Sequence, residues 1–245
     1  MKTDVRPLLA FAASSLFVFA CGGSLPYPGL TATEIYNIGV QAMEEERWDA
    51  AVHAFQAMVL TSGFESASEA RLRLAQSEFE RENYIEARAE YQRTLDRFPT
   101  DTTAAHASLG ICRSLAELSP TPHRDQGFTR QARTNCRQVA ADYAGTVVGL
   151  RASEIAVDMF NKLAEQDYNT GLHYWKRKLP DSALLYFEAV ENTYPESIWA
   201  PWALIKKIEV FEDIGYTQDA EETREKLLEL YPDSEPAKLL EDGAN

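Results

Sequence analysis

The sequence predicts an all-α protein, a right-handed solenoid of about five helical hairpins that includes one long bridging helix. Three observations lead to this prediction. An alanine recurs along the chain and is followed, twelve residues later, by a small residue or a proline. An aromatic residue stands four positions after three of these alanines, and one long stretch near the middle lacks proline altogether. The alanine pairs are Ala51 with Gly63, Ala87 with Pro99, Ala132 with Ala144, Ala183 with Pro195, and Ala220 with Pro232.

The spacing of these positions is typical of tetratricopeptide repeats. The position four residues after each alanine, where such a repeat carries a bulky side chain, holds Phe55, Tyr91, Cys136, Phe187 and Arg224 in turn, so three of five match. Twelve residues before four of the alanines stand Gly39, Ala75, Gly171 and Ile208, where the first helix needs a small residue so that the second can approach. Stacked hairpins of this kind form a curved solenoid that holds other proteins, so the pattern favours a scaffold.

Residues 1–20 are typical of an export leader. Two basic residues near the start precede thirteen uncharged ones, residues 8–20, and this run is too short to span a bilayer, which needs about 20 apolar residues in a helix. The segment from Val18 to Cys21 resembles the lipobox of bacterial lipoproteins, in which the chain is cut before the cysteine. We therefore expect Cys21 to carry acyl chains such as palmitate, with residues 21–32 as a flexible tether. The alternative is an ordinary secretory signal with an incidental cysteine.

The first three hairpins are expected within residues 33–145. The second of them closes at Pro99, because proline cannot continue a helix. Between Ala87 and Ala132 the spacing widens to 45 residues, where about 34 is normal. The surplus is the polar stretch 119–128, which we expect to form an inserted loop that points away from the stack.

The bridging helix and the C-terminal repeats are expected within residues 146–245. Residues 147–178 contain no proline and carry apolar residues at helical spacing, which predicts one long helix. The fourth and fifth hairpins follow and close at Pro195 and Pro232. Residues 235–243 should form a short terminal cap.

Composition and charge exclude several classes of function. The formal net charge of the chain is -14, so nucleic acid is not an expected partner, since binding phosphates requires clustered cations. The densest basic cluster, residues 176–178, is interpreted as a solvated helix end. The four histidines lie far apart, and the sequence has neither a glycine-rich phosphate loop nor a serine in a nucleophile elbow. We therefore expect no enzyme activity, no cofactor and no metal.

Two cysteines remain once Cys21 is assigned to the anchor. Cys112 and Cys136 fall on the two predicted helices of the third hairpin. In an oxidising compartment they either form a disulfide or stay as two small buried thiols, and the sequence leaves both alternatives open.

Helical phase suggests where a partner binds. In a stacked hairpin array the first helix of each unit lines the concave side, and this rule predicts a short apolar trough on the first two hairpins for an extended peptide with aromatic residues. Two of its members, Leu72 and Phe79, fit the core equally well. The six residues of the predicted trough are Tyr36, Val40, Met43, Leu72, Gln76 and Phe79.

Taken together, several features resemble the BamD family of outer-membrane lipoproteins, which belong to the barrel-assembly machinery. They are the lipobox cysteine, five repeats, a third unit lengthened by Arg124-Asp125-Gln126, and a bridging helix that ends in Tyr174-Trp175-Lys176-Arg177. The resemblance runs from about Thr33 to Lys238 and is most specific between Leu163 and Ser197.

The resemblance implies an adaptor at the outer membrane that is lipid-anchored, faces the periplasm and is not an enzyme. Its implied partners are the periplasmic domains of the barrel-inserting protein, other assembly lipoproteins and unfolded outer-membrane proteins. Substrates would bind the trough, and the barrel-inserting protein would bind the C-terminal repeats, where Trp199, Trp202 and Lys206 are candidate contacts. The alternative is another envelope lipoprotein built from the same repeats, such as a pilus pilotin or a coordinator of cell-wall synthesis.

Overall fold

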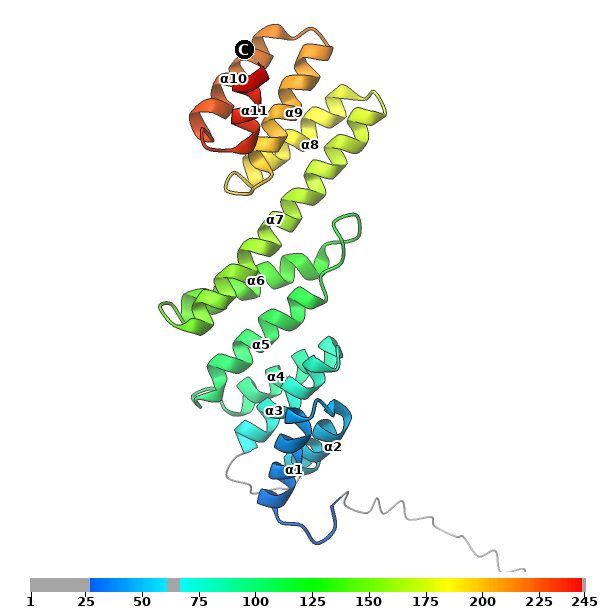
Figure 1. Ribbon diagram of the computed structural model, residues 1–245, viewed down its shortest axis with the longest axis vertical. Coiled ribbons are helices and arrows are strands. Elements are labelled where there is room, and N and C mark those ends of the chain that lie inside the picture. Colours follow the sequence, from blue (N-terminus) through cyan, green and yellow to red (C-terminus); the bar gives the residue numbers. More distant parts are fainter. Residues whose placement is uncertain (1–26, 61–66, 244–245) are drawn as a thin grey trace, which may run out of the picture.

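The computed structural model describes residues 27–60 and 67–243, and all regular secondary structure within these ranges is helical. The helices pack as successive hairpins into a long curved stack, with α1 at one end and α11 at the other (Figure 1). The predicted fold class, a helical tetratricopeptide solenoid, is confirmed. The helices are α1 (Ala32–Glu44), α2 (Trp48–Leu60), α3 (Ala67–Glu80), α4 (Tyr84–Arg97), α5 (Thr103–Glu117), α6 (Gly127–Asp142), α7 (Val147–Lys176), α8 (Pro180–Thr193), α9 (Ala200–Asp213), α10 (Thr217–Leu230) and α11 (Glu235–Gly243).

Local sequence signals set where several helices begin. Helix α1 starts with a capping box, in which the Glu34 backbone N–H donates to the Thr31 hydroxyl at 3.3 Å and the Thr31 backbone N–H donates to the Glu34 carboxylate at 2.8 Å. The Thr146 hydroxyl caps α7 by accepting a hydrogen bond from the Gly149 N–H at 3.2 Å. Helix α8 begins at Pro180. Proline lacks a backbone N–H, but an N–H in the first turn of a helix would have no intrahelical partner, so no hydrogen bond is lost.

Glycines let aromatic rings approach the neighbouring helix closely. A Cβ atom on Gly39 would lie 2.7 Å from the Phe55 ring, and one on Gly171 would lie 2.6 Å from the Phe187 ring. Both rings are fully buried. The expected small residue opposite a bulky one is therefore confirmed in the first and fourth hairpins.

The insertion between α5 and α6 agrees with the prediction at its tip and differs at its ends. Residues 123–125 are exposed and the loop stands out from the stack, as expected (Figure 1), whereas its two ends pack inward. The Ser119 carbonyl accepts a hydrogen bond from Lys162 Nζ of α7 at 3.0 Å. Gln126 is buried, and its Nε2 donates to the carbonyls of Thr121 and Arg124 at 2.8 and 3.0 Å. The loop thus folds upon itself because the glutamine amide satisfies its backbone.

Helix α7 connects the two ends of the stack. Its 30 residues pack against α5 and α6 in the first half and against α8 in the second (Figure 1). Met159 belongs to the core that surrounds Tyr91, while Ala164 and Tyr168 belong to the core that surrounds Phe187. The expected long bridging helix is confirmed, and it is also the first helix of the fourth hairpin.

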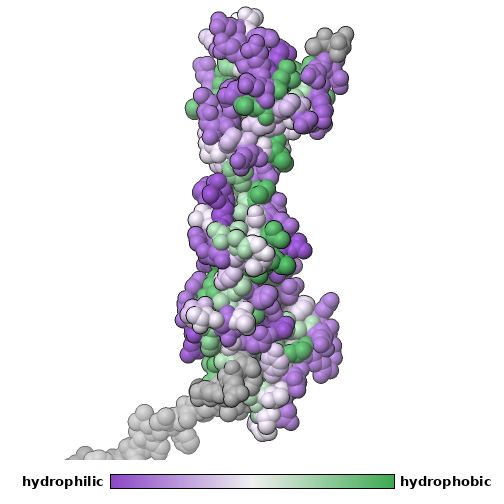
Figure 2. Space-filling view, turned by 90° about the vertical axis from the view of Figure 1, so that its left-hand side faces the viewer, coloured by the Kyte–Doolittle hydropathy of each residue, from purple (hydrophilic) through white to green (hydrophobic). Residues whose placement is uncertain are grey.

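The surface of the stack is largely polar. Figure 2 shows hydrophilic residues over most of one long face, with hydrophobic patches between them along its middle. In the parts of the chain that the structure describes, no helix combines the length and the apolarity needed to cross a membrane. The predicted leader and Cys21 lie outside the described residues.

Candidate binding surfaces

Helix α1 contributes an apolar strip to the predicted trough. Tyr36, Val40 and Met43 are each half-buried and pack against the core of the first hairpin. The Tyr36 ring meets the Phe55 ring edge to face, with centroids 5.8 Å apart. These three side chains therefore combine a fixed position with an exposed edge, as a peptide-binding strip requires.

Helix α3 corrects the rest of the predicted trough. Leu72 and Phe79 are only 4% and 7% exposed and belong to the core, so neither lines an accessible trough. The reason is that α3 packs against three helices, α2, α4 and α5, which cover the face that repeat phase assigned to the concave side. The guanidinium of Arg113 in α5 also lies over the Phe79 ring, 4.2 Å from its centroid.

The accessible strip of α3 is polar instead. Gln76 is half-buried beside Arg73, which donates from Nε to the Glu69 carboxylate at 2.8 Å and from NH1 to Gln76 Oε1 at 3.4 Å. The first two hairpins therefore present an apolar strip on α1 and a hydrogen-bonding strip on α3.

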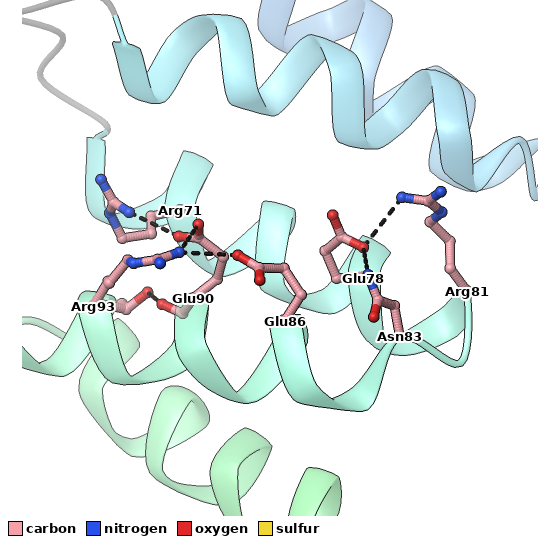
Figure 3. A network of polar contacts seen from close by, with 8 residues as sticks. Arg71, Glu78, Arg81, Asn83, Glu86, Glu90 and Arg93 are labelled. Atoms are coloured by element: carbon pink, nitrogen blue, oxygen red, sulfur yellow. Dashed lines mark hydrogen bonds and ion pairs between the residues drawn. The ribbon is translucent and has the colours of Figure 1, made fainter.

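Sequence reasoning missed a polar network that joins α3 to α4 (Figure 3). Arg71 donates to the Glu90 carboxylate at 2.7 Å, and both side chains are almost fully buried. Arg93 also donates to Glu90, and it donates to Glu86 at 3.1 Å. Because every buried charge here has an opposite partner, we interpret the network as a support for the second hairpin.

The candidate contacts on the C-terminal repeats lie on the first half of α9 and on Trp199, the residue that precedes it. The Trp199 ring packs on the Tyr168 ring with centroids 4.9 Å apart, and Trp202 is half-buried in the same cluster. Burial raises the pKa of the Tyr168 hydroxyl to about 12, with a further contribution from the negative charge of Glu209. Lys206 donates to the Glu209 carboxylate at 2.7 Å. This surface joins anchored aromatic rings to an exposed ion pair.

A buried acid binds the last two hairpins to each other. Glu191 of α8 accepts a hydrogen bond from Lys207 of α9 at 2.6 Å and another from Lys226 of α10. Burial raises the pKa of the Glu191 carboxyl, but the hydrogen bonds and positive charges of the two lysines outweigh it and leave the pKa below its usual value. The ionised acid therefore stabilises the contact between α8, α9 and α10.

The two remaining cysteines are paired. Cys112 of α5 and Cys136 of α6 form a disulfide, with Cα atoms 5.0 Å apart in the buried core of the third hairpin. Of the two alternatives left open by the sequence, the structure thus contains the disulfide. Among residues 27–60 and 67–243, no group of three or more histidine, cysteine or acidic side chains is placed to hold a metal ion.

A groove between α6 and α7 was not foreseen. It encloses about 540 Å³, and the turn that follows α8 forms its third side. The signal for it was present in the sequence, since Arg130, Arg133 and Arg137 share one helical face of α6. Its lining comprises Arg133, Arg137, Ala140, Ser153, Ala156, Val157, Phe160, Thr193, Pro195 and Glu196.

The chain is similar to known proteins over most of its length. Residues 28–235 match the family described as YfiO, outer membrane lipoprotein. The outer membrane protein assembly factor BamD of Caulobacter vibrioides is 25% identical over 224 residues, which cover 88% of this chain and 73% of that protein. The protein of the same name from Rickettsia prowazekii is 24% identical over 202 residues, covering 82% of this chain and 80% of that protein.

Solved structures of tetratricopeptide proteins also match. A complex of the TPR2AB domain of yeast Sti1 with pHSP90 aligns with 84% of this chain and 80% of that chain, at 12% identity and a TM-score of 0.43. TTC0263, a thermophilic TPR protein of Thermus thermophilus, aligns with 87% of this chain and 98% of that chain, at 16% identity and a TM-score of 0.37.

Proposed function

The chain belongs to the YfiO family of outer membrane lipoproteins, and on that premise we propose that it is a non-catalytic adaptor in the assembly of outer-membrane proteins. It acts in the periplasm, anchored to the outer membrane by lipid on Cys21. It holds a barrel-inserting protein and unfolded barrel substrates close to each other. The two relatives named as outer membrane protein assembly factors support this role.

One observation carries the proposal. A single continuous helix, α7, joins two stacks of hairpins, and each stack presents anchored aromatic side chains with exposed edges. On the N-terminal stack this is the strip that contains Tyr36, and on the C-terminal stack it is the cluster of Trp199 and Trp202. Aromatic anchors of this kind are enriched at the centres of protein interfaces. A molecule with two such surfaces on one rigid support is suited to hold two partners at once.

The surfaces are assigned to different partners. Unfolded barrel segments are extended and carry aromatic residues, so they suit the apolar strip of α1 and the polar strip of α3. The folded periplasmic domains of the barrel-inserting protein, together with other assembly lipoproteins, suit the C-terminal cluster, where Lys206 and Glu209 add a polar rim. Replacing Tyr36 by alanine should weaken binding of a C-terminal barrel peptide, while Trp202→Ala should leave it unchanged.

The anchor has its own test. Cys21→Ala removes the thiol that would be acylated, so the variant should appear in the soluble fraction after cell lysis, while the parent chain sediments with membranes. Mass spectrometry of the parent should find acyl chains on this cysteine. A variant that stays acylated and membrane-bound would show that the anchor lies elsewhere.

The partner assignment is tested by isolating the tagged protein from its own membranes in mild detergent and identifying proteins that copurify in near-equal amounts. Recovery of a large outer-membrane barrel with repeated periplasmic domains is the expected result. Recovery of pilus or cell-wall components in its place would refute the assembly role and make this chain an adaptor for another client.

A further inference from the structure

The groove between α6 and α7 combines apolar and basic side chains. Its apolar lining comes from Ala156, Val157 and Phe160 of α7 and from Pro195 in the turn after α8. Its volume of about 540 Å³ lies in the range of about 300–1,000 Å³ that holds small ligands. The groove therefore accommodates a few side chains of an extended segment and excludes a folded domain.

One guanidinium in this groove is held in place. Arg133 lies over the Phe160 ring, 4.7 Å from its centroid, and the Phe160 ring meets the Tyr194 ring at 5.3 Å. A cation over an aromatic face is attracted by the ring quadrupole, so the stack fixes the position of the charge. An arginine fixed in this way loses little freedom when it binds a carboxylate.

Neither guanidinium of the groove has an ion-pair partner within the described chain, although Glu196 lines the same groove. Arg133 and Arg137 form no ion pair with a described residue, although Arg71, Arg93 and Arg224 each do. The absence is informative because the whole chain carries 38 acidic residues against 24 lysines and arginines. Helix α6 itself holds only one acid, Asp142, and its carboxylate accepts a hydrogen bond from Gln138 at 2.8 Å.

An exposed apolar strip continues from the groove along α7. Val157 is 54% exposed, and Leu150 and Val147 on the same face are 62% and 74% exposed. These residues are seven and three positions apart, which places them along one side of a helix. An exposed apolar strip beside a charged groove is typical of a protein-binding site.

We propose that the α6–α7 groove binds an extended acidic segment of a partner protein. Two of its carboxylates pair with Arg133 and Arg137, and an apolar side chain between them packs on Phe160 and Val157. The occupant is a peptide and not an anionic membrane surface, because the groove is recessed between α6 and α7, where an extended segment can lie but a flat bilayer surface cannot reach. The proposal adds a third surface to the two described above and depends on neither.

The test uses fluorescence anisotropy with the purified protein and a labelled hexapeptide, Asp-Leu-Asp-Phe-Glu-Leu. A matched neutral peptide, Asn-Leu-Asn-Phe-Gln-Leu, has the same shape without the charges. We expect the acidic peptide to bind at least about tenfold more tightly. Arg137→Gln should weaken its binding by about tenfold, and the double variant with Arg133→Gln should abolish it. Arg97→Gln, an exposed arginine at the end of α4, changes the same charge away from the groove and should have no effect.

The two arginine variants distinguish a loss of peptide binding from a loss of folded structure. No contact of the Arg137 side chain supports the described fold, so Arg137→Gln reports on the groove alone. Arg133→Gln could also disturb Phe160, and circular dichroism therefore checks the helical content of both variants. The proposal is overturned if the neutral peptide binds equally well, if binding survives the double variant, or if no binding is seen at about 1 mM peptide. It is also overturned if phosphatidylglycerol vesicles, in place of the peptide, bind in an arginine-dependent way. None of these results would alter the copurification test of the assembly role.

Discussion

The contact between α7 and α8 makes a sharp prediction for Gly171→Ala. Gly171 faces the ring of Phe187, which is fully buried. The added Cβ would lie 2.6 Å from one ring carbon and 2.8 Å from the next. Favourable contacts between carbon atoms lie at about 3.5–4.0 Å, so the ring or the helix must move by about 1 Å.

Two opposing effects set the magnitude. Alanine favours the helix over glycine by about 1 kcal/mol, which would stabilise the variant at a solvent-facing position. Overpacking a filled core costs about 1–3 kcal/mol, and the upper part of that range applies here because the Phe187 ring has no free space to enter. The free energy of unfolding should therefore fall by about 1–2 kcal/mol. Phe187→Leu makes room, so the double variant should be less destabilised than the sum of the two single variants by about 1 kcal/mol.

The assay is urea unfolding followed by circular dichroism at 222 nm. Ser153→Ala on the exposed side of α7 serves as a baseline and should change stability by less than about 0.5 kcal/mol. A Gly171→Ala variant that is more stable than the parent chain, or a double variant whose effects simply add, would refute the close approach of these helices.

Three further predictions concern the stability of other parts of the stack. Cys112→Ser removes the link to Cys136, 24 residues away, and should lower the free energy of unfolding by up to about 3.5 kcal/mol, while the reducing agent dithiothreitol should act on the parent chain alone. Arg71→Met leaves its buried glutamate partner with one cation fewer and should lower the free energy of unfolding in urea by about 2–4 kcal/mol. Arg151→Met, at an exposed ion pair, should lower it by under about 1 kcal/mol. Equal losses in the two variants would contradict the argument from burial. The lowered pKa of Glu191 stabilises the fold at pH values above the usual glutamate pKa, and this contribution is lost as the pH falls through the folded-state pKa. Glu191→Gln should therefore lower the urea midpoint at neutral pH by more than at about pH 3, and a gap that is independent of pH would contradict this.

Much of the fold was predictable because the repeat pattern records contacts between neighbours in sequence. A small residue such as Gly39 or Gly171 and an aromatic residue sixteen positions later report the same helix-to-helix contact. The absence of proline in residues 147–178 marked α7. Such signals are local, and each hairpin carries its own copy of them.

The candidate site was less predictable because exposure depends on how many neighbours a helix has. The position of Leu72 and Phe79 within the helical repeat predicted that both lie on an open face. In the structure α3 is enclosed by three helices and leaves mainly polar side chains accessible. Likewise, the spacing of Cys112 and Cys136 gives no distance between α5 and α6. The arginines of α6 were visible in the sequence, but only the structure places Arg133 over the Phe160 ring and leaves Arg133 and Arg137 without an ion pair to a described residue.

Helix α7 also sets the distance between the two ends of the molecule. Thirty residues at about 1.5 Å each make a strut of about 45 Å. Two adjacent residues at the middle of α7 form hydrogen bonds to the two halves of the molecule. Lys162 donates to the Ser119 carbonyl in the N-terminal half, and Asn161 accepts from the Ile198 N–H in the C-terminal half. The spacing and the relative rotation of the two end surfaces are therefore set by helical geometry. One residue added to α7 would turn one end by about 100° against the other, so the length of this helix, more than its composition, determines how the N-terminal and C-terminal surfaces are oriented relative to each other.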